Sequence, residues 1–274
     1  MLNKMKNFNF KQNSRKAIFG ILAASSVFFQ TGCKDDEGSN PTPGTPNEST
    51  AFIPSKDKKY TYKIVEEDGS TTMEYLRVKS VKDSSGLAVS YLESKLIADE
   101  DTVILDWKAY STAAVTTYEI SYANTLLEVQ DLLSQMGEVL EFNITGFPNR
   151  RLMENKIQEG SKLTFQGDPI KLTAKIKSED NDEPVIVEME ATVTYKNGTV
   201  TKVENITTPA GTFKCSKWSY GYTSIVKFFI NGQLFDTSTD VYTIEEWTSP
   251  GIGRVKTEET FGDIFSKSEL QKIE

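Results

Sequence analysis

Apolar and polar residues alternate along much of the second half of the chain. From Ile170 to Lys177 every second residue is apolar, and the residues between are Lys or Thr. The segment from Val185 to Tyr195 repeats this alternation, with Glu or Thr at most of the polar positions. A period of two is typical of a strand with one buried face and one face in water. The polar segment Ser178–Glu183 predicts the loop that joins the two strands.

Asn-Gly pairs predict where strands reverse. Asn197-Gly198 and Asn231-Gly232 each follow an alternating segment, and this pair is favoured in two-residue hairpin turns. The alternation is looser in the first half of the body, where Glu67-Asp68-Gly69 predicts a further turn. Antiparallel strands are expected there around Tyr60–Ile64, Met73–Lys79, Leu87–Leu96, Thr102–Tyr110 and Val115–Tyr122.

One segment has helical spacing instead. Its apolar residues lie three or four positions apart, which places them on one face of a helix. These residues are Leu126, Val129, Leu133, Met136 and Leu140. Thr125 and Glu128 fit a capping box at its start. We expect a helix near residues 125–140 that covers one side of the sheet, in preference to a helix for a partner or cofactor.

No shift in composition divides the body between Ala51 and Glu274. We therefore predict a single, mainly β domain over residues 51–274. Its strands, about ten to twelve, should form one large curved antiparallel sheet, because strand twist accumulates in sheets of that size. The sheet is expected to be an open half-barrel or a closed barrel, with the helix against its concave side.

The first 32 residues have the features of an export signal. They contain five positive charges and no acidic residue, followed by the apolar run Ala17–Phe29. A hydrocarbon core of about 30 Å needs roughly 20 apolar residues, so this run is too short to be a comfortable transmembrane helix. We expect residues 1–32 to be a signal peptide that is removed.

The residues after the apolar run resemble a bacterial lipoprotein signal of the Bacteroidota type. Gln30-Thr31-Gly32 places small residues directly before Cys33. The resemblance implies that Cys33 becomes the first residue and carries acyl chains such as palmitate. The segment that follows, Lys34-Asp35-Asp36-Glu37, resembles the tag that sends such lipoproteins to the outer face of the outer membrane. The alternative is a secreted protein, cleaved near Gly32, in which Cys33 is free or structural.

The mature N-terminus reads as a tether. Residues 34–50 contain three prolines, two glycines and no apolar side chain, so they cannot bury a core. Loss of residues 1–32 removes five of the 31 Lys and Arg residues and none of the 39 Asp and Glu residues, which leaves a net charge of −13. This charge disfavours a nucleic-acid partner. The membrane, reached through the acyl chains on Cys33, is the expected partner of a monomeric protein.

The composition excludes several kinds of catalytic and metal site. The chain has no histidine and only two cysteines, which removes histidine-dependent nucleophiles and multi-cysteine metal centres. The acidic runs Asp99–Asp101 and Glu179–Glu183 lack calcium-loop spacing and fit solvated hairpin tips better. Gly251-Ile252-Gly253 lacks the third glycine of a dinucleotide site. We expect no catalytic residue, no metal and no cofactor, with Cys215 a small buried hydrophobe.

Two segments in the last third carry a second resemblance. Thr208–Cys215 reads TPAGTFKC, and Trp247–Lys256 reads WTSPGIGRVK. In this order they resemble a family of uncharacterised bacterial envelope proteins with a PAGTF element followed by a PGxGxVK element. The resemblance implies a curved antiparallel sheet similar to the unclosed barrel of the lipoprotein carriers (Lol type). Physically, both segments contain turns between strands.

The expected function follows from the anchor and the sheet together. We predict an outer-membrane lipoprotein that is not an enzyme and that lies on the periplasmic or the cell-surface face, with the surface favoured. Its curved sheet, rich in aromatic residues, would bind an apolar or amphiphilic ligand in its concavity. The alternative is a structural module with a filled core that binds a protein or glycan. A carboxylate-dependent glycosidase ranks third, since no local sequence points to one.

Overall fold

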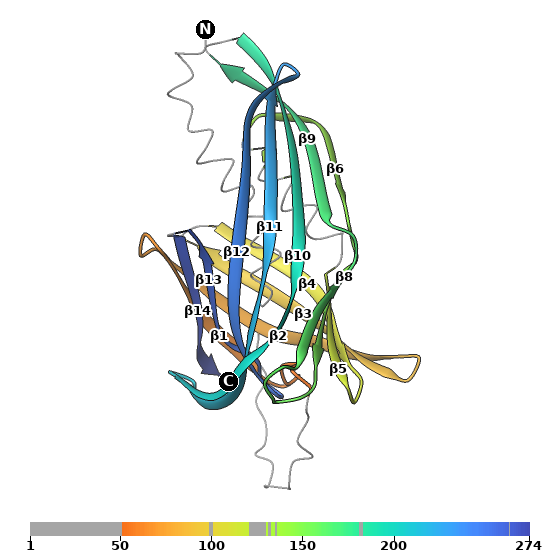
Figure 1. Cartoon of the computed structure of the whole chain (residues 1–274), viewed down its shortest axis with the longest axis vertical. Coiled ribbons are helices and arrows are strands. Elements are labelled where there is room, and N and C mark those ends of the chain that lie inside the picture. The colour runs from red at the N-terminus through yellow and green to blue at the C-terminus, as the bar shows by residue number, and fades with distance from the viewer. Residues whose placement is uncertain are drawn as a thin grey trace, which may run out of the picture.

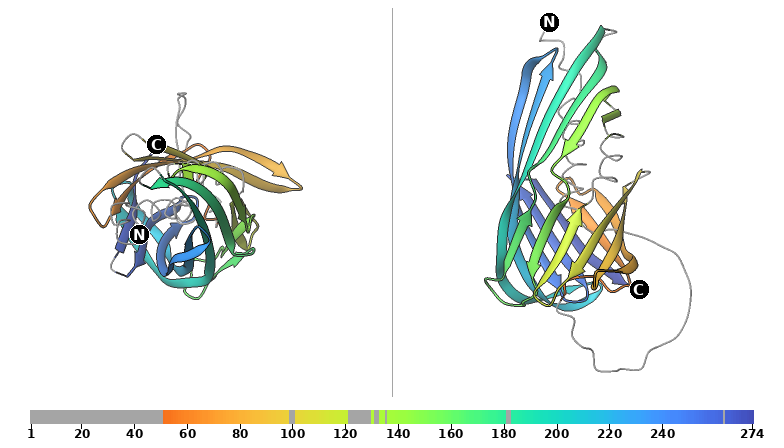
Figure 2. Two further views of the ribbon diagram at one scale, coloured as in Figure 1. Left: turned by 90° about the horizontal axis from the view of Figure 1, so that it is seen from above. Right: turned by 90° about the vertical axis from the view of Figure 1, so that its right-hand side faces the viewer.

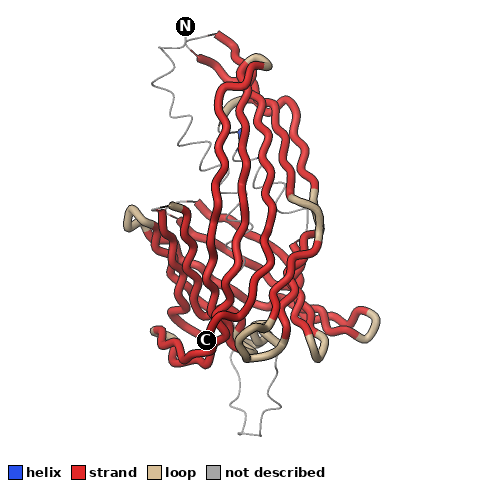
Figure 3. The backbone as a smooth tube through the Cα atoms, viewed as in Figure 1, coloured by secondary structure: helices blue, strands red, loops and turns tan. Residues whose placement is uncertain are grey.

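The computed structural model describes residues 51–98, 101–120, 130, 133–134, 136–180, 183–262 and 264–274. The described secondary structure is almost entirely antiparallel β, as predicted (Figure 3). The strands are β1 Lys59–Glu66, β2 Thr71–Ser84, β3 Leu87–Ala98, β4 Asp101–Ser111, β5 Val115–Ile120, β6 Glu138–Thr145, β7 Asn149–Glu154, β8 Lys162–Gln166, β9 Ile170–Asp180, β10 Glu183–Thr208, β11 Gly211–Ile230, β12 Gln233–Ser249, β13 Gly253–Phe261 and β14 Ile264–Ile273. Among the described residues, no helix is long and apolar enough to cross a membrane.

Twelve of the strands form a closed barrel. The sheet runs β11-β12-β13-β14-β1-β2-β3-β4-β5-β7-β8-β10, and pairing of β10 with β11 closes the ring. Every pairing in it is antiparallel, including that of β1 with β14, which joins the two ends of the described chain. The sequence left a half-barrel and a barrel open, and the structure decides for closure. Figure 1 shows this barrel as the lower, wider part of the molecule.

A five-stranded extension continues from one end of the barrel. The long strands β10, β11 and β12 pass beyond the rim, and β9 and β6 add to the side of β10. β12 pairs with β13 only from Thr243 onward, so its earlier residues belong to the extension alone. Figure 1 and the right-hand view of Figure 2 show a tall curved sheet that rises above one part of the barrel wall. We call this sheet the extension and the barrel opening beneath it the mouth.

Asn197-Gly198 is not a hairpin turn, and this prediction was wrong. β10 continues through the pair to Thr208, and the pairing register with β11 shifts between Lys196 and Thr199. At this bulge β10 exchanges β9 for β8 as its neighbour, because Gly198 pairs with Leu163. The Asn197 Oδ1 atom accepts a hydrogen bond from the Phe165 backbone N–H at 2.9 Å. The pair therefore marks where the barrel wall becomes the extension.

The other turn predictions are confirmed, with one boundary corrected. Asn231 and Gly232 have φ values of 50° and 78° and join β11 to β12. Gly69, with φ 80°, lies between β1 and β2. The loop expected over Ser178–Glu183 is shorter than predicted, because Asp180 and Glu183 pair directly with each other. Alternation alone cannot show that polar residues at a strand end stay paired.

The predicted helix near 125–140 falls mostly outside the described residues. Leu133 and Ser134 have helical backbone, and Leu133 and Met136 are buried as the stripe predicted. Leu140 is not helical, since it lies in β6 with 44% of its surface exposed. The Gly137 N–H donates to the Ser134 carbonyl at 3.3 Å, and the extended chain of β6 begins at the next residue.

Candidate functional site

The interior of the barrel contains buried ion pairs. Arg151 on β7 donates from Nη1 to the Glu246 Oε2 atom at 2.7 Å, and the Tyr220 hydroxyl donates to the same oxygen at 2.8 Å. Burial by itself lowers the pKa of Arg151, but Glu246 raises it above the usual value. A second buried pair joins Arg254 on β13 to Glu74 on β2, and Ser268 donates to the other Glu74 oxygen. These networks join strands that are not neighbours in the ring.

The start of the described chain fills the barrel end opposite the extension. The Phe52 N–H donates to the Thr116 Oγ1 atom at 3.1 Å, and the Tyr118 hydroxyl donates to the Phe52 carbonyl. The Phe52 ring lies edge-on to Trp218, with the centroids 5.8 Å apart. The Gly251 N–H donates to the Ala51 carbonyl at 2.9 Å. Residues 51 and 52, where the described chain begins, are therefore bound to the core of the barrel.

The PGxGxVK segment has a structural part in this closure. Gly253 has a φ of 78°, and a Cβ atom there would lie 3.1 Å from the Cγ of Pro54. The backbone at the turn between β12 and β13 thus lies directly against the entering chain. This explains the glycine at this position without any ligand, as expected from the sequence.

The barrel interior is packed with large side chains that are fully buried. They include Phe52, Tyr60, Tyr62, Leu76, Leu92, Tyr118, Trp218 and Arg254. An interior filled by aromatic rings and paired charges is a core. The same apolar cluster continues onto the extension, whose inner face is the candidate site.

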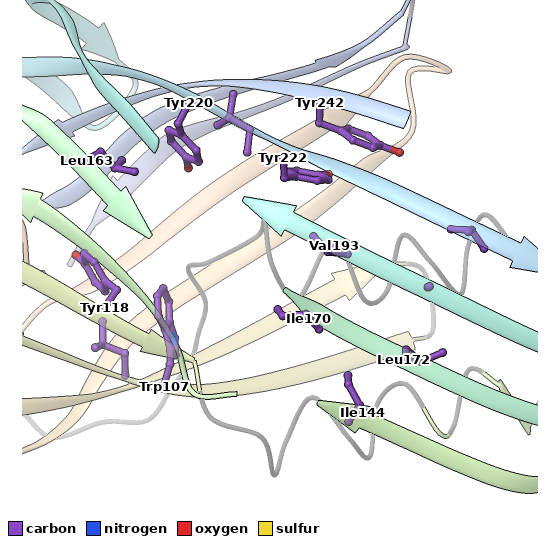
Figure 4. Close-up of a cluster of buried hydrophobic side chains, with 14 of the residues drawn as sticks. Trp107, Tyr118, Ile144, Leu163, Ile170, Leu172, Val193, Tyr220, Tyr222 and Tyr242 are labelled. Carbon is purple, nitrogen blue, oxygen red and sulfur yellow. The ribbon is translucent and has the colours of Figure 1, made fainter. Parts of the chain in front are cut away.

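The inner face of the extension is apolar. On β9 the buried residues are the alternate ones, Ile170, Leu172, Ala174 and Ile176. β10 and β6 contribute Val187, Met189, Ala191, Val193 and Ile144, and β11 contributes Val226 and Phe228. All of them belong to the same cluster as the barrel core. Figure 4 shows this continuity from Trp107 and Tyr118 to Ile144, Leu172 and Val193.

The outer face of the extension has the opposite character. Three ion pairs cross its strands: Lys175 with Glu188 at 3.4 Å, Lys177 with Glu138 at 3.7 Å, and Lys227 with Glu190 at 3.7 Å. These side chains are one-third exposed or more, so each pair contributes little to stability. They do show which face is solvated. A groove of about 350 Å³ between β6, β9 and β10 is lined largely by polar and charged residues, among them Glu141, Asn143, Thr173, Lys175, Glu188 and Glu190.

A row of aromatic rings crosses the base of the extension at the mouth. It consists of Phe165, Tyr195, Tyr222, Tyr242 and Phe261, one from each of β8, β10, β11, β12 and β13. Successive ring centroids are 4.5, 5.8, 4.4 and 4.9 Å apart. Rings at these separations attract one another beyond their burial. The row forms an aromatic floor beneath the apolar face.

Tyr222 connects this floor to a carboxylate. Its hydroxyl donates to the Glu259 Oε1 atom at 2.5 Å. Burial, followed by the Glu259 charge, raises the pKa of Tyr222 far above its usual value, so the phenol stays protonated. Sequence reasoning missed this pair, because Tyr222 and Glu259 are 37 positions apart and no local pattern joins them.

Cys215 is buried, as predicted, in a small separate cluster with Trp247 and Val255. Burial, followed by the nearby Glu204 carboxylate, raises the pKa of its thiol to about 12. The Trp247 indole N–H donates to Glu204 at 3.0 Å, and Lys217 and Lys256 lie over the indole ring. A neutral, buried thiol is inert, and the cluster holds the PAGTF hairpin to the barrel wall.

The predicted anchor lies outside the described residues. Cys33 and the candidate tag Lys34, Asp35, Asp36 and Glu37 all precede residue 51, so their roles remain predictions. Among the residues that the structure describes, no group of three or more acidic or cysteine side chains could hold a metal ion.

Comparison with known proteins finds a family match for the second half of the chain. Residues 137–270 match the DUF3108-like family. This range extends from the start of β6 to within β14, and it includes the extension and both glycine-containing segments discussed above. No curated protein matches the chain.

Two solved structures resemble the chain. A protein of Parabacteroides distasonis described as a candidate lipoprotein aligns with a TM-score of 0.51 and 18% identity, covering 83% of this chain and 100% of its own. At that identity the likeness shows the fold alone. A protein of Bacteroides fragilis, described as a candidate exported protein with a YmcC-like fold, aligns with a TM-score of 0.48 and 18% identity, over 82% and 99% of the two chains.

Proposed function

We propose that this protein is a non-enzymatic outer-membrane lipoprotein that holds an apolar or amphiphilic ligand on the inner face of its extension. Cys33 carries the acyl chains, and Lys34–Glu37 directs the protein to the cell surface. Two or three acyl chains suffice for stable anchorage, because each buried CH₂ contributes about 0.8 kcal/mol. The description of the Parabacteroides distasonis neighbour as a candidate lipoprotein supports a cell-envelope setting.

The apolar inner face of the extension carries this proposal. The outer face has ion pairs, whereas the inner face has aliphatic side chains on β9 and much of β10, as in an antiparallel sheet with one covered face. The barrel below buries its own large side chains, among them Trp218 and Tyr62. The inner-face residues are 0 to 6% exposed and share one cluster with Leu133 and Met136, so the ligand of this proposal would take the place of side chains that pack there.

The arrangement also suits a protein held by its N-terminus. Ala51 and the turn at Gly251 lie at the end of the barrel away from the extension, since β11 and β12 run from there to the hairpin at Asn231-Gly232. The tether of about 17 residues can span several tens of ångströms. An anchored molecule can therefore present its apolar face well away from its own lipids.

Ligand binding can be tested by filling the face. Ala191 points inward on β10 and is 4% exposed, whereas Thr194 on the same strand is exposed. Ala191→Trp should weaken binding of a fluorescent fatty-acid probe by about tenfold or more, and Thr194→Trp should leave it unchanged. The protein should begin at residue 34, which keeps every described residue. Equal binding by both variants and the parent would contradict the assigned face.

The filled barrel favours a second candidate, a module that binds a protein or glycan through its surface. If the chain has this second function, it should bind no fluorescent lipid, with or without Ala191→Trp. Saturable binding of the probe to the parent therefore separates the two functions.

A further inference from the structure

The extension ends in an open strand edge at β6. Among the described residues, β9 is the only strand that pairs with β6. Figure 1 shows β6 as the outermost strand on that side of the extension. The barrel wall, by contrast, closes on itself through β10 and β11. An open edge presents backbone N–H and C=O groups to which another extended chain can add.

Part of this edge is regular. β6 has a bulge between Val139 and Glu141, but residues 141–145 pair with β9 in unbroken register. These five residues read EFNIT and contain no proline, lysine or glycine. Proteins often protect an exposed edge with prolines, lysines or bulges, and this stretch has none of them. Its length is within the usual range of a strand, so it is long enough to pair with one.

The two sides of this edge differ in character. On the inner side, Ile144 is buried and Phe142 is half-buried. On the outer side, Glu141 and Asn143 are exposed. A strand added beside β6 would place alternate side chains on these two sides. The inner side therefore favours aliphatic residues in the added strand, and the outer side favours residues that interact with Glu141.

Carboxylates outnumber bases on the outer side. Glu141 is directly opposite Lys175, but Lys175 pairs with Glu188 at 3.4 Å. The groove of about 350 Å³ described above adjoins the edge, because β6 forms one of its walls, and its lining includes three glutamates and one lysine. The third glutamate, Glu190, pairs with Lys227 at 3.7 Å. A further cation is therefore favoured at this groove, and a further carboxylate is not.

We propose that this edge docks an extended peptide segment of a protein partner, in which basic and aliphatic residues alternate. The segment adds to residues 141–145 as a sixth strand of the extension. Its aliphatic side chains continue the inner side beyond Phe142 and Ile144, and its Lys or Arg side chains reach the carboxylates of the groove. A second copy of β6 would bring another glutamate there and fits less well. The inference is independent of the proposed amphiphile, since it requires no ligand on the inner face.

Three labelled heptapeptides test the docking. The first, KVKVKVK, has the required alternation. The second, KVKPKVK, has the same charge, but its central proline lacks the N–H that strand pairing needs. The third, EVEVEVE, keeps the alternation and reverses the charge. Fluorescence anisotropy with the protein from residue 34 should show saturable binding of KVKVKVK, about tenfold or more tighter than of either other peptide.

Hydrogen exchange and variants locate the bound peptide. Amides of residues 138–145 should exchange more slowly with KVKVKVK bound, because the edge becomes paired. Glu141→Lys should weaken binding about tenfold or more, and Glu141→Gln, which is milder to the sheet, should weaken it severalfold. Glu67→Lys is the matched control, because it makes the same change of charge in the exposed turn between β1 and β2. It should leave the affinity unchanged within about twofold.

Several results would overturn docking at β6. Equal binding of KVKVKVK and KVKPKVK would show attraction between charges without strand pairing. Slower exchange elsewhere but not in residues 138–145 would place the peptide away from this edge. Absence of saturable binding, or equal effects of Glu141→Lys and Glu67→Lys, would also contradict the inference. None of these results changes the outcome of the fatty-acid assay, which reports on the inner face alone.

Discussion

Arg151 and Glu246 meet across the inside of the barrel, with Nη1 and Oε2 2.7 Å apart, although three strands separate β7 from β12 in the ring. Both side chains are almost fully buried, at 5% and 3% exposure. Such a pair stabilises the barrel little relative to apolar residues of the same size, but it is expensive to break. It therefore holds one side of the barrel wall to the other as long as both partners are present.

Removal of one partner should be strongly destabilising. We expect Glu246→Ala to lower the free energy of unfolding by about 3 to 5 kcal/mol, because the Arg151 charge is left buried without its partner. Urea denaturation measures the change. Glu245→Ala, which removes the partly exposed partner of Lys217, should cost less than about 1 kcal/mol. Similar losses in both variants would contradict this role for the buried pair.

Gly198 should tolerate no side chain. A Cβ atom at this position would lie 2.6 Å from the Tyr220 Cβ and would also meet the Ser219 carbonyl. Gly198→Ala is expected to destabilise the protein by about 1 to 3 kcal/mol, as overpacking does, and to disturb the junction of barrel and extension. Gly160→Ala is the control. Its φ of 81° opposes the substitution, but no atom lies within 4 Å of the added Cβ position. Thermal unfolding of the two variants compares them, and a smaller loss for Gly198→Ala would be contrary to expectation.

The same position shows what the sequence could and could not predict. Alternation identified β9, most of β10 and the earlier strands, because it reports which face of a strand is buried. It could not show that β10 passes through Asn197-Gly198, since the choice between a turn and a bulge depends on the strands alongside. Closure of the barrel is likewise a property of the β10 and β11 pairing.

The candidate site was predictable only in outline. The sequence predicted a concave apolar surface rich in aromatic residues, but it could not place that surface on the extension, because the barrel core and the extension have the same alternating pattern. Tyr222 and Glu259 read as two unremarkable positions of two separate strands. Their contact depends on the register of β12 with β11 and β13.

Cys215 should make stability depend on alkaline pH. Its pKa is about 12 in the folded protein, above the value of about 8.5 expected for an unfolded thiol. A raised folded pKa means that the contribution to stability is complete below about pH 8.5 and is lost as the pH rises towards 12. Urea titrations between about pH 8 and 10 should show a shallower decline for Cys215→Ala than for the parent. Identical slopes would show that the thiol is not protected by burial.

Lipid attachment at Cys33 has a direct test. Cells grown with labelled palmitate should label the parent protein, and Cys33→Ala should abolish the label because no thiol remains to be acylated. Cys215→Ala serves as the control and should be labelled normally, since that cysteine is in the folded body. Persistent label in Cys33→Ala would favour an ordinary secreted protein.

The acidic residues after Cys33 should determine the membrane face. Changing Asp35, Asp36 and Glu37 together to Ala should reduce cleavage of the protein by protease added to intact cells. Acylation should persist, since Cys33 is unchanged. Changing residues 47–49 together to Ala, which removes one acidic residue, is the matched control. It should leave cleavage by the added protease unchanged. Unchanged cleavage of the tag variant would remove the surface assignment alone.

Native mass spectrometry can test the claim that the extension holds an amphiphile. The protein from residue 34 is exported to a bacterial periplasm, purified without detergent, and weighed before and after solvent extraction. We predict a stoichiometric excess mass that is extractable, is identified as a lipid, and is reduced in Ala191→Trp but retained in Thr194→Trp. A protein that carries no excess mass, even after incubation with envelope lipids, would contradict the claim.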